Sequence, residues 1–160
     1  MSIKVGDKLP EATFMTMGAD GPEPITTSEM FGGKRVALFA VPGAFTPTCS
    51  AKHLPGYKEQ ADAFKAKGID AIACTSVNDV FVMGAWSKDQ GVSGEMTLLA
   101  DGNGDFADTI GLVLDATGFG MGKRSQRYAM VVNDGTVEAL HVESGGEFKV
   151  SAAEYVLSNL

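Results

Sequence analysis

The sequence predicts an α/β protein in which a central sheet carries helices on both faces. Helical and strand-like patterns alternate along the 160 residues, which is typical of that class. The continuous apolar run Arg35–Ala40 has strand length and indicates a central strand covered on both faces, and Ile69–Cys74 is predicted to be a second central strand. Asn133-Asp134-Gly135 is a strong hairpin signal. The length suits one full-sized core, so we predict a single domain over residues 1–160.

The N-terminal part is expected to form a hairpin followed by a short helical turn. Residues 11–27 have the pattern of a hairpin, with the turn at residues 18–22, where two glycines and a proline occur. Ser28 is the expected N-cap of a helical turn that ends before Gly32. The strand Arg35–Ala40 follows.

An interrupted helix is expected between the two central strands. It begins near Thr46–Cys49, directly after a turn rich in proline and glycine. Pro55-Gly56 should kink or break it, because proline lacks the N–H that a helix interior requires. The helix should then resume from Tyr57 to Lys67 and stop at Gly68.

The remaining elements continue the alternation to the C-terminus. We predict helices over 78–90, 105–112 and 152–160, and strands over 96–100, 128–132 and 137–142. The segment Gly118–Arg124 has the look of a phosphate-binding loop but lacks the required spacing and the final Ser or Thr. We therefore expect it to be a flexible loop.

Composition and charge exclude several classes of function. A formal net charge of −7 leaves nothing to neutralise phosphates, which disfavours nucleic acid and anionic membranes as partners. The most apolar run, residues 36–45, is interrupted by Pro42 and Gly43 and is too short to span a bilayer. The first residues lack the apolar segment of a signal peptide, so a cytoplasmic location is expected. Two cysteines and two histidines are too few for a disulfide framework or a four-ligand zinc site.

The chemistry of the chain is expected at Cys49. This cysteine lies at the predicted start of a helix, where the free N–H groups and the partial positive charge of the helix stabilise a thiolate. Thr46 lies one turn earlier, with a hydroxyl that can reach the sulfur or its reaction partner. The ordinary fate of a cysteine is to be a small buried core residue. The hydroxyls and the irregular backbone around Cys49 favour a nucleophile instead.

The motif Pro-x-x-x-Thr-x-x-Cys, formed by Pro42, Thr46 and Cys49, resembles the active-site motif of the peroxiredoxins. The longer run Val41–Ser50 is similar to the peroxiredoxin-5-like and plant type II subfamily, as are Ser76–Asp79 and Arg127–Val132. This resemblance implies a thioredoxin-like fold: a central mixed sheet flanked by helices, with an N-terminal hairpin extension. It also implies a thiol peroxidase and a homodimer, with no metal, flavin or nucleotide.

The resemblance assigns a role to each catalytic residue. The Cys49 thiolate would attack hydrogen peroxide or a small alkyl hydroperoxide and become a sulfenic acid. Arg127 would keep the sulfur ionised and stabilise charge on the leaving oxygen. Thr46 would hold the peroxide, and Pro42 would shield the sulfur from water. From the residues alone, Arg124 is an equal candidate for the role of Arg127, and only the family pattern favours Arg127.

A one-cysteine mechanism is expected, with glutaredoxin and glutathione or thioredoxin as the external reductant. Some relatives carry a second catalytic cysteine just before the C-terminal helix, where this chain has Val150. Cys74 ends an apolar strand and is predicted to be a buried core residue.

Two other functions are compatible with the sequence. His53 lies four residues after Cys49, so the two could form the Cys–His pair of a hydrolase. Alternatively, the protein could be a redox sensor or holdase that passes oxidation to a partner protein. Cys49-Ser50-Ala51-Lys52 is not C-x-x-C, which argues against a disulfide reductase.

Overall fold

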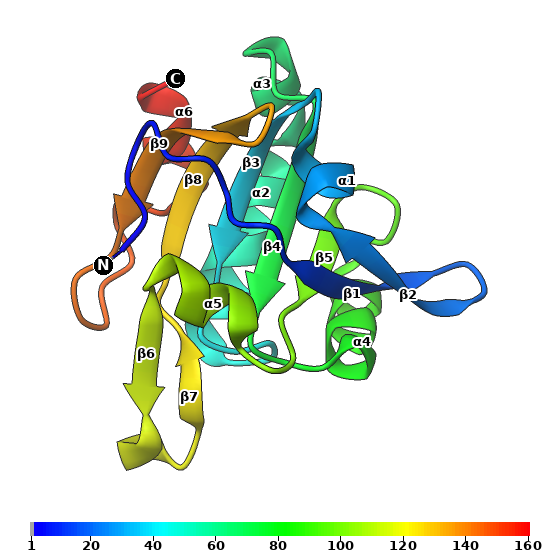
Figure 1. Cartoon of the computed structure of the whole chain (residues 1–160), viewed down its shortest axis with the longest axis vertical. Helices are drawn as coiled ribbons and strands as arrows, with labels where there is room; N and C mark the ends of the chain where they lie inside the picture. Colours follow the sequence, from blue (N-terminus) through cyan, green and yellow to red (C-terminus); the bar gives the residue numbers. More distant parts are fainter. Residues whose placement is uncertain (1) are drawn as a thin grey trace.

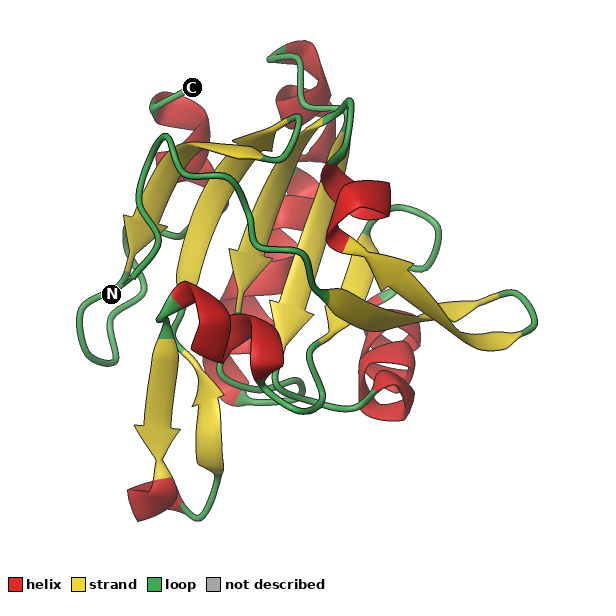
Figure 2. Cartoon of the chain, viewed as in Figure 1, coloured by secondary structure: helices red, strands yellow, loops and turns green. Residues whose placement is uncertain are grey.

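The architecture is a seven-stranded mixed sheet with helices on both faces (Figures 1 and 2). It is described by a computed structural model that covers residues 2–160. The order of the strands in the sheet is β2-β1-β5-β4-β3-β8-β9. These strands are β1 (Thr13–Gly18), β2 (Gly21–Thr26), β3 (Arg35–Ala40), β4 (Ala71–Ser76), β5 (Thr97–Ala100), β8 (Tyr128–Asn133) and β9 (Thr136–Val142).

Each face of the sheet is covered by its own set of helices, as the sequence predicts. The helices are α1 (Thr27–Phe31), α2 (Leu54–Glu59), α3 (Ala61–Ala66), α4 (Val80–Gln90), α5 (Asp105–Ile110) and α6 (Ala153–Ser158). On one face, Phe31 of α1 and Phe106 of α5 pack in a core with Leu38 of β3. On the other face, α2, α4 and α6 pack against Phe39, the next residue of β3. Successive side chains of a strand point to opposite faces, so one apolar run serves both cores.

The pairing of β3 brings two distant segments of the chain together. β3 is parallel to β4 and antiparallel to β8, with Ala40 opposite both Thr75 and Tyr128. The residues that follow Ala40 therefore emerge beside the residue that precedes Tyr128. This end of the sheet lies next to a separate hairpin in Figure 1.

The N-terminal hairpin forms as predicted and continues the central sheet. β1 pairs with β2 from Thr13 to Gly18 and joins β5 through Met15 and Ala100. The predicted strand at 69–74 is displaced by two residues, because β4 covers Ala71–Ser76. No helix within residues 2–160 is long and apolar enough to cross a membrane.

The segment from residue 113 to 125 differs from its prediction. The expected flexible loop at 118–124 is wrong: β6 (Val113–Ala116) and β7 (Gly122–Ser125) pair as a second sheet, with the 3-10 turn η2 (Thr117–Phe119) between them. This hairpin stands away from the central sheet in Figure 1. Its strands have four residues each and no continuous apolar run, so they lack the period that reveals a strand.

The predicted N-cap of α1, Ser28, is wrong, because the structure has Thr26 at that position. The Thr26 hydroxyl accepts from the Glu29 N–H at 3.2 Å, and the Glu29 carboxylate accepts from the Thr26 N–H at 3.0 Å. This reciprocal pair is a capping box. Ser28 lies inside the helix and donates to Glu11 on the surface.

Thr26→Ala should lower the free energy of unfolding by about 1 kcal/mol, because it removes the cap acceptor. Thr26→Ser keeps the hydroxyl and should remain close to wild type. Chemical denaturation of both variants and of Ser28→Ala is the measurement. A larger loss in Ser28→Ala than in Thr26→Ala would contradict the assignment of the cap.

Candidate active site

The backbone after β3 forms a tight turn that is held by side chains. The Thr46 hydroxyl donates to the Gly43 carbonyl at 2.6 Å, and the Ala44 N–H donates to Asn78 Oδ1 at 3.0 Å. Phe45 between them has φ of +64°, a left-handed conformation that a bulky side chain rarely adopts. Such strain is typical of functional sites whose surroundings enforce the conformation.

Cys49 begins a π-helical turn, η1 (Cys49–His53), that runs directly into α2. The Leu54 N–H donates to the Cys49 carbonyl, one residue further back than in an α-helix. The predicted break at Pro55-Gly56 is wrong, because Pro55 lies in the first turn of α2, where a missing N–H costs nothing. The irregularity falls before the proline, and the break falls at Gln60, between α2 and α3.

The sulfur of Cys49 is buried and lies against the guanidinium of Arg127. The Arg127 Nη2 donates to Cys49 Sγ at 3.1 Å, although 78 residues separate them in the chain. Arg127 directly precedes β8, so the pairing of β3 with β8 delivers both groups to the same end of the sheet. A guanidinium in this position provides positive charge for an oxygen that lies beside the sulfur.

Arg124, the alternative cation, does not contact the sulfur. Its Nη1 donates to the Val77 carbonyl at 3.2 Å, and its Nε donates to the Met121 carbonyl at 3.0 Å. It thus ties β7 to the segment after β4. Of the two arginines that the residues alone left equal, only Arg127 lies at Cys49.

His53 links Arg127 to the opposite side of the site. Arg127 Nη1 lies 2.7 Å from His53 Nδ1, and His53 Nε2 lies 3.1 Å from the Ser151 carbonyl. Because a guanidinium can only donate, Nδ1 is the acceptor, and Nε2 carries the proton that is donated to Ser151. Burial, with a smaller effect of the Arg127 charge, lowers the pKa of His53 to about 3. His53 is therefore a neutral, fully engaged imidazole.

A shallow hollow leads to the site from outside. Pro42, Thr46 and Arg127 line it, together with an apolar wall from the β6–β7 hairpin that includes Leu114, Ala116, Phe119 and Met121. Pro42 and Thr46 therefore lie in the same hollow as Arg127. Of this wall, only Phe119 could be anticipated from the sequence as an apolar group near the site, because the hairpin itself was not predicted.

Cys74 is a free, fully buried thiol in the same core layer as Cys49. Burial and, to a smaller extent, the charge of Cys49 raise the pKa of Cys74 well above its usual value, while Arg127 acts in the opposite direction. The prediction of a core cysteine agrees with this position. No cluster of three or more His, Cys, Asp or Glu side chains among residues 2–160 is arranged to hold a metal ion.

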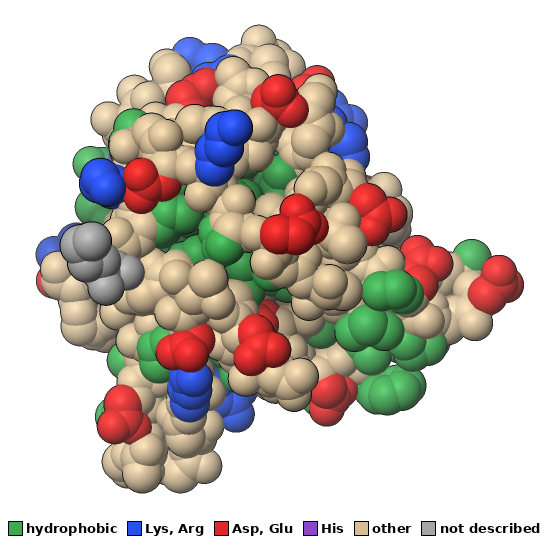
Figure 3. Space-filling view, in the orientation of Figure 1, with side chains coloured by type: hydrophobic (Ala, Val, Ile, Leu, Met, Phe, Trp, Pro, Cys, Tyr) green, Lys and Arg blue, Asp and Glu red, His purple; other side chains and the backbone are tan. Residues whose placement is uncertain are grey.

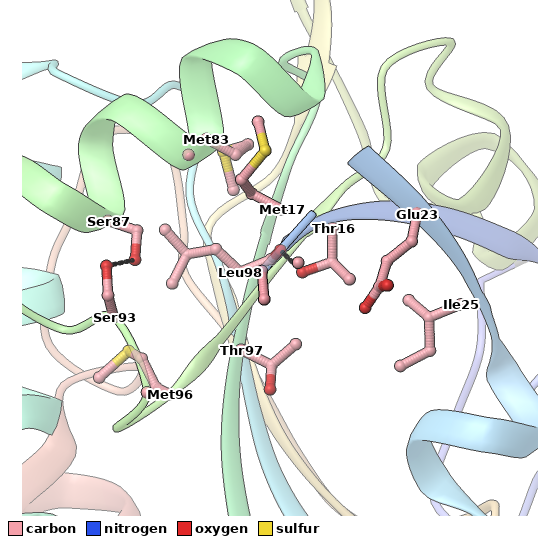
Figure 4. A pocket seen from close by; sticks show the side chains of 14 residues that line it. Thr16, Met17, Glu23, Ile25, Met83, Ser87, Ser93, Met96, Thr97 and Leu98 are labelled. Carbon is pink, nitrogen blue, oxygen red and sulfur yellow. Dashed lines mark hydrogen bonds between the residues drawn. The ribbon is translucent and has the colours of Figure 1, made fainter. Parts of the chain in front are cut away.

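Another hollow lies between the β1–β2 hairpin, α4 and the start of β5 (Figure 4). Methionine, serine and threonine side chains line it, and Glu23 is the one ionisable group among its lining residues. Its lining contains no cysteine, histidine, lysine or arginine. Acidic side chains are scattered over the face seen in Figure 3, with Lys and Arg side chains lying among them.

A buried thiol in contact with a guanidinium at the end of a mixed sheet is an arrangement that suits thiol-based redox chemistry. Comparison with known proteins gives the family. A family model described as Redoxin matches residues 4–157, so the chain belongs to the redoxin family. Peroxiredoxin-2E, chloroplastic, of Arabidopsis thaliana is 50% identical over 163 residues, covering 99% of this chain and 70% of that protein.

Solved structures of similar proteins support the same family assignment. Reduced Prx3 from Vibrio vulnificus in complex with H₂O₂ has a TM-score of 0.94 and 50% identity, and the match covers 98% of each chain. The antioxidant protein (1-Cys peroxiredoxin) of Plasmodium falciparum has a TM-score of 0.90 and 31% identity, with 99% of this chain and 100% of that chain covered. The protein is a thiol peroxidase of the peroxiredoxin class with the predicted thioredoxin-like fold.

The neutral state of His53 should make stability depend on pH. The unfolded chain takes up a proton near the ordinary histidine pKa, whereas the folded protein resists protonation down to about 3, so acid favours unfolding. Between about pH 6.5 and about pH 5 this effect should remove roughly 1.5 kcal/mol from the free energy of unfolding. His53→Gln can make both hydrogen bonds without titrating. Its free energy of unfolding should therefore lack this part of the pH dependence. Denaturation curves that shift in parallel for both proteins would contradict the assignment.

Proposed function

We propose that Cys49 is the nucleophile that reduces hydrogen peroxide and small alkyl hydroperoxides, with Arg127, Thr46 and Pro42 as its supporting residues. The observation that carries the proposal is the contact of 3.1 Å between Arg127 Nη2 and Cys49 Sγ. The Vibrio vulnificus relative, whose structure holds H₂O₂, supports the choice of substrate.

The geometry supports a simple displacement. The sulfur anion attacks one peroxide oxygen, an S–O bond forms, and the O–O bond breaks. The leaving oxygen takes up a proton and departs as water or an alcohol, and Cys49 becomes a sulfenic acid. The guanidinium of Arg127 stabilises the negative charge as it moves from sulfur to the leaving oxygen. The apolar wall at Leu114, Phe119 and Met121 would accept the alkyl group of an organic hydroperoxide.

A Cys–His hydrolase is not favoured by this geometry. A general base needs a free lone pair near the thiol, and the acceptor nitrogen of His53 is occupied by Arg127. The low pKa of about 3 also leaves His53 a weak base.

Peroxide reduction should therefore depend on Arg127 far more than on His53. In stopped-flow oxidation by H₂O₂, Cys49→Ser should show no reaction at this site. Arg127→Lys keeps the charge but loses the planar fork, and should slow the reaction about 100-fold. His53→Gln should lose less than about tenfold, whereas removal of a true general base costs roughly 10²–10⁴-fold. Equal losses in Arg127→Lys and His53→Gln would contradict the proposed roles.

We also propose a one-cysteine catalytic cycle with an external thiol as reductant. Cys74 is buried among core side chains, and Val150 occupies the position where some relatives carry a resolving cysteine. The Plasmodium falciparum relative is described as a 1-Cys peroxiredoxin. Cys49 is itself buried, so the segment around it must open before glutaredoxin, glutathione or thioredoxin can reach the sulfenic acid.

Cys74→Ser should retain most of the wild-type turnover, because no disulfide to Cys74 is needed in this cycle. The measurement is steady-state consumption of H₂O₂ with dithiothreitol, with glutaredoxin plus glutathione, or with thioredoxin, for wild type, Cys49→Ser and Cys74→Ser. A Cys74→Ser protein as inactive as Cys49→Ser would contradict the one-cysteine cycle. Slow turnover with every donor, together with a mixed disulfide on another protein, would instead indicate a redox sensor.

We also propose that the protein is a homodimer and is located in the cytoplasm. Phe119 at the tip of the β6–β7 hairpin is 86% exposed, and Phe45 beside the site is 51% exposed. Large exposed apolar side chains of this kind suit a contact between two copies. We propose that residues 118–122 form part of that contact.

A further inference from the structure

Glu143 is a buried carboxylate outside the residues that the peroxide reaction uses directly. It follows β9, is only 7% exposed, and its Oε2 accepts three hydrogen bonds. The donors are the Lys149 N–H at 2.7 Å, the Ser151 N–H at 2.8 Å and the Ser151 hydroxyl at 2.6 Å. The Glu143 side chain thus binds the far end of the segment between β9 and α6, which we call the 144–151 loop.

Two residues of the 144–151 loop, Phe148 and Ser151, contact His53, and Phe148 also lies beside Arg127. The Ser151 carbonyl accepts from His53 Nε2 at 3.1 Å and from the Tyr57 hydroxyl at 2.8 Å. The Phe148 ring lies 4.9 Å from the His53 ring and 5.8 Å from the Arg127 guanidinium carbon. A displaced loop would leave the Nε2 proton of His53 buried without an acceptor, and would free the imidazole that holds Arg127.

Glu143 is also tied to Arg127 through the backbone. Its N–H donates to the Arg127 carbonyl at 3.0 Å. Burial alone would raise the pKa of Glu143, but the hydrogen bonds from Ser151 and Lys149 lower it below the usual value. The carboxylate is therefore ionised at neutral pH, and the bonds that it accepts are the strong, charge-assisted kind.

We propose that Glu143 is a positioning residue of the peroxide reaction. It fixes the 144–151 loop, and through Ser151 and His53 it holds the Arg127 guanidinium against Cys49. The inference rests on the proposed function of Cys49 and Arg127. It extends the site to a carboxylate that never touches the substrate.

Glu143→Gln tests the inference, with Glu147→Gln as the matched control. Glu147 lies in the same loop, is exposed, and pairs only with Lys149 at the surface. The rate of Cys49 oxidation by H₂O₂ in a single turnover should fall about tenfold in Glu143→Gln, because one charge-assisted network is weakened. Glu147→Gln should stay within about twofold of wild type.

A double-mutant cycle separates positioning from a general loss of structure. If Glu143 acts through Arg127, Glu143→Gln should cause no further loss of rate in the Arg127→Lys background. An equal loss in both backgrounds, or a Glu143→Gln rate equal to that of Glu147→Gln, would overturn the inference. Should Glu143→Gln fail to fold, Ser151→Ala takes its place in the cycle, with an expected loss of about threefold in the wild-type background alone. A wild-type Cys49 that does not react with peroxide would instead overturn the proposed function.

Discussion

The contact between the Arg127 guanidinium and the Cys49 sulfur is the interaction on which the rest of the site depends. The two residues are 78 positions apart in the sequence, so only the fold can bring them together. The antiparallel pairing of β3 with β8 places the two chain segments together, and the turn after β3 directs the first residue of η1 towards Arg127. The two apolar cores that cover β3 therefore have a chemical consequence, because they fix the end of the sheet where sulfur and cation meet.

The partner that holds the other terminal nitrogen of Arg127, His53, is neutral and neither removes a proton from the guanidinium nor adds a charge to the site. His53 is kept neutral by burial and accepts from the guanidinium, so it orients Arg127 without competing for the sulfur. Its remaining proton is satisfied by Ser151, whose position depends on Glu143. Each buried polar group in this chain of contacts has a partner, as a low-dielectric site requires. Through this series of contacts, the conformation of the loop before α6 determines the position of the Arg127 guanidinium.

Much of this arrangement could be predicted from the sequence, and the exceptions have physical reasons. The apolar runs of β3 and β4 predicted the central strands, and the resemblance around Cys49 pointed to Arg127 before the fold showed the contact. The β6–β7 hairpin was missed because its short strands lack an apolar period. Glu143 and Ser151 were missed because they lie in a loop with no motif, and only the folded backbone brings them together.

The most direct test of the account compares two reactions of the same sulfur. Arg127 should stabilise the leaving oxygen of a peroxide, whereas alkylation by iodoacetamide has no such oxygen. Any other effect of Arg127 on the sulfur acts on both reactions and cancels in their ratio. The measurement is the ratio of the two rate constants of Cys49, in wild type and in Arg127→Lys. We expect the ratio of the peroxide rate constant to the iodoacetamide rate constant to fall at least about tenfold in Arg127→Lys. An unchanged ratio would show that Arg127 does not stabilise the leaving oxygen, and would contradict its proposed role.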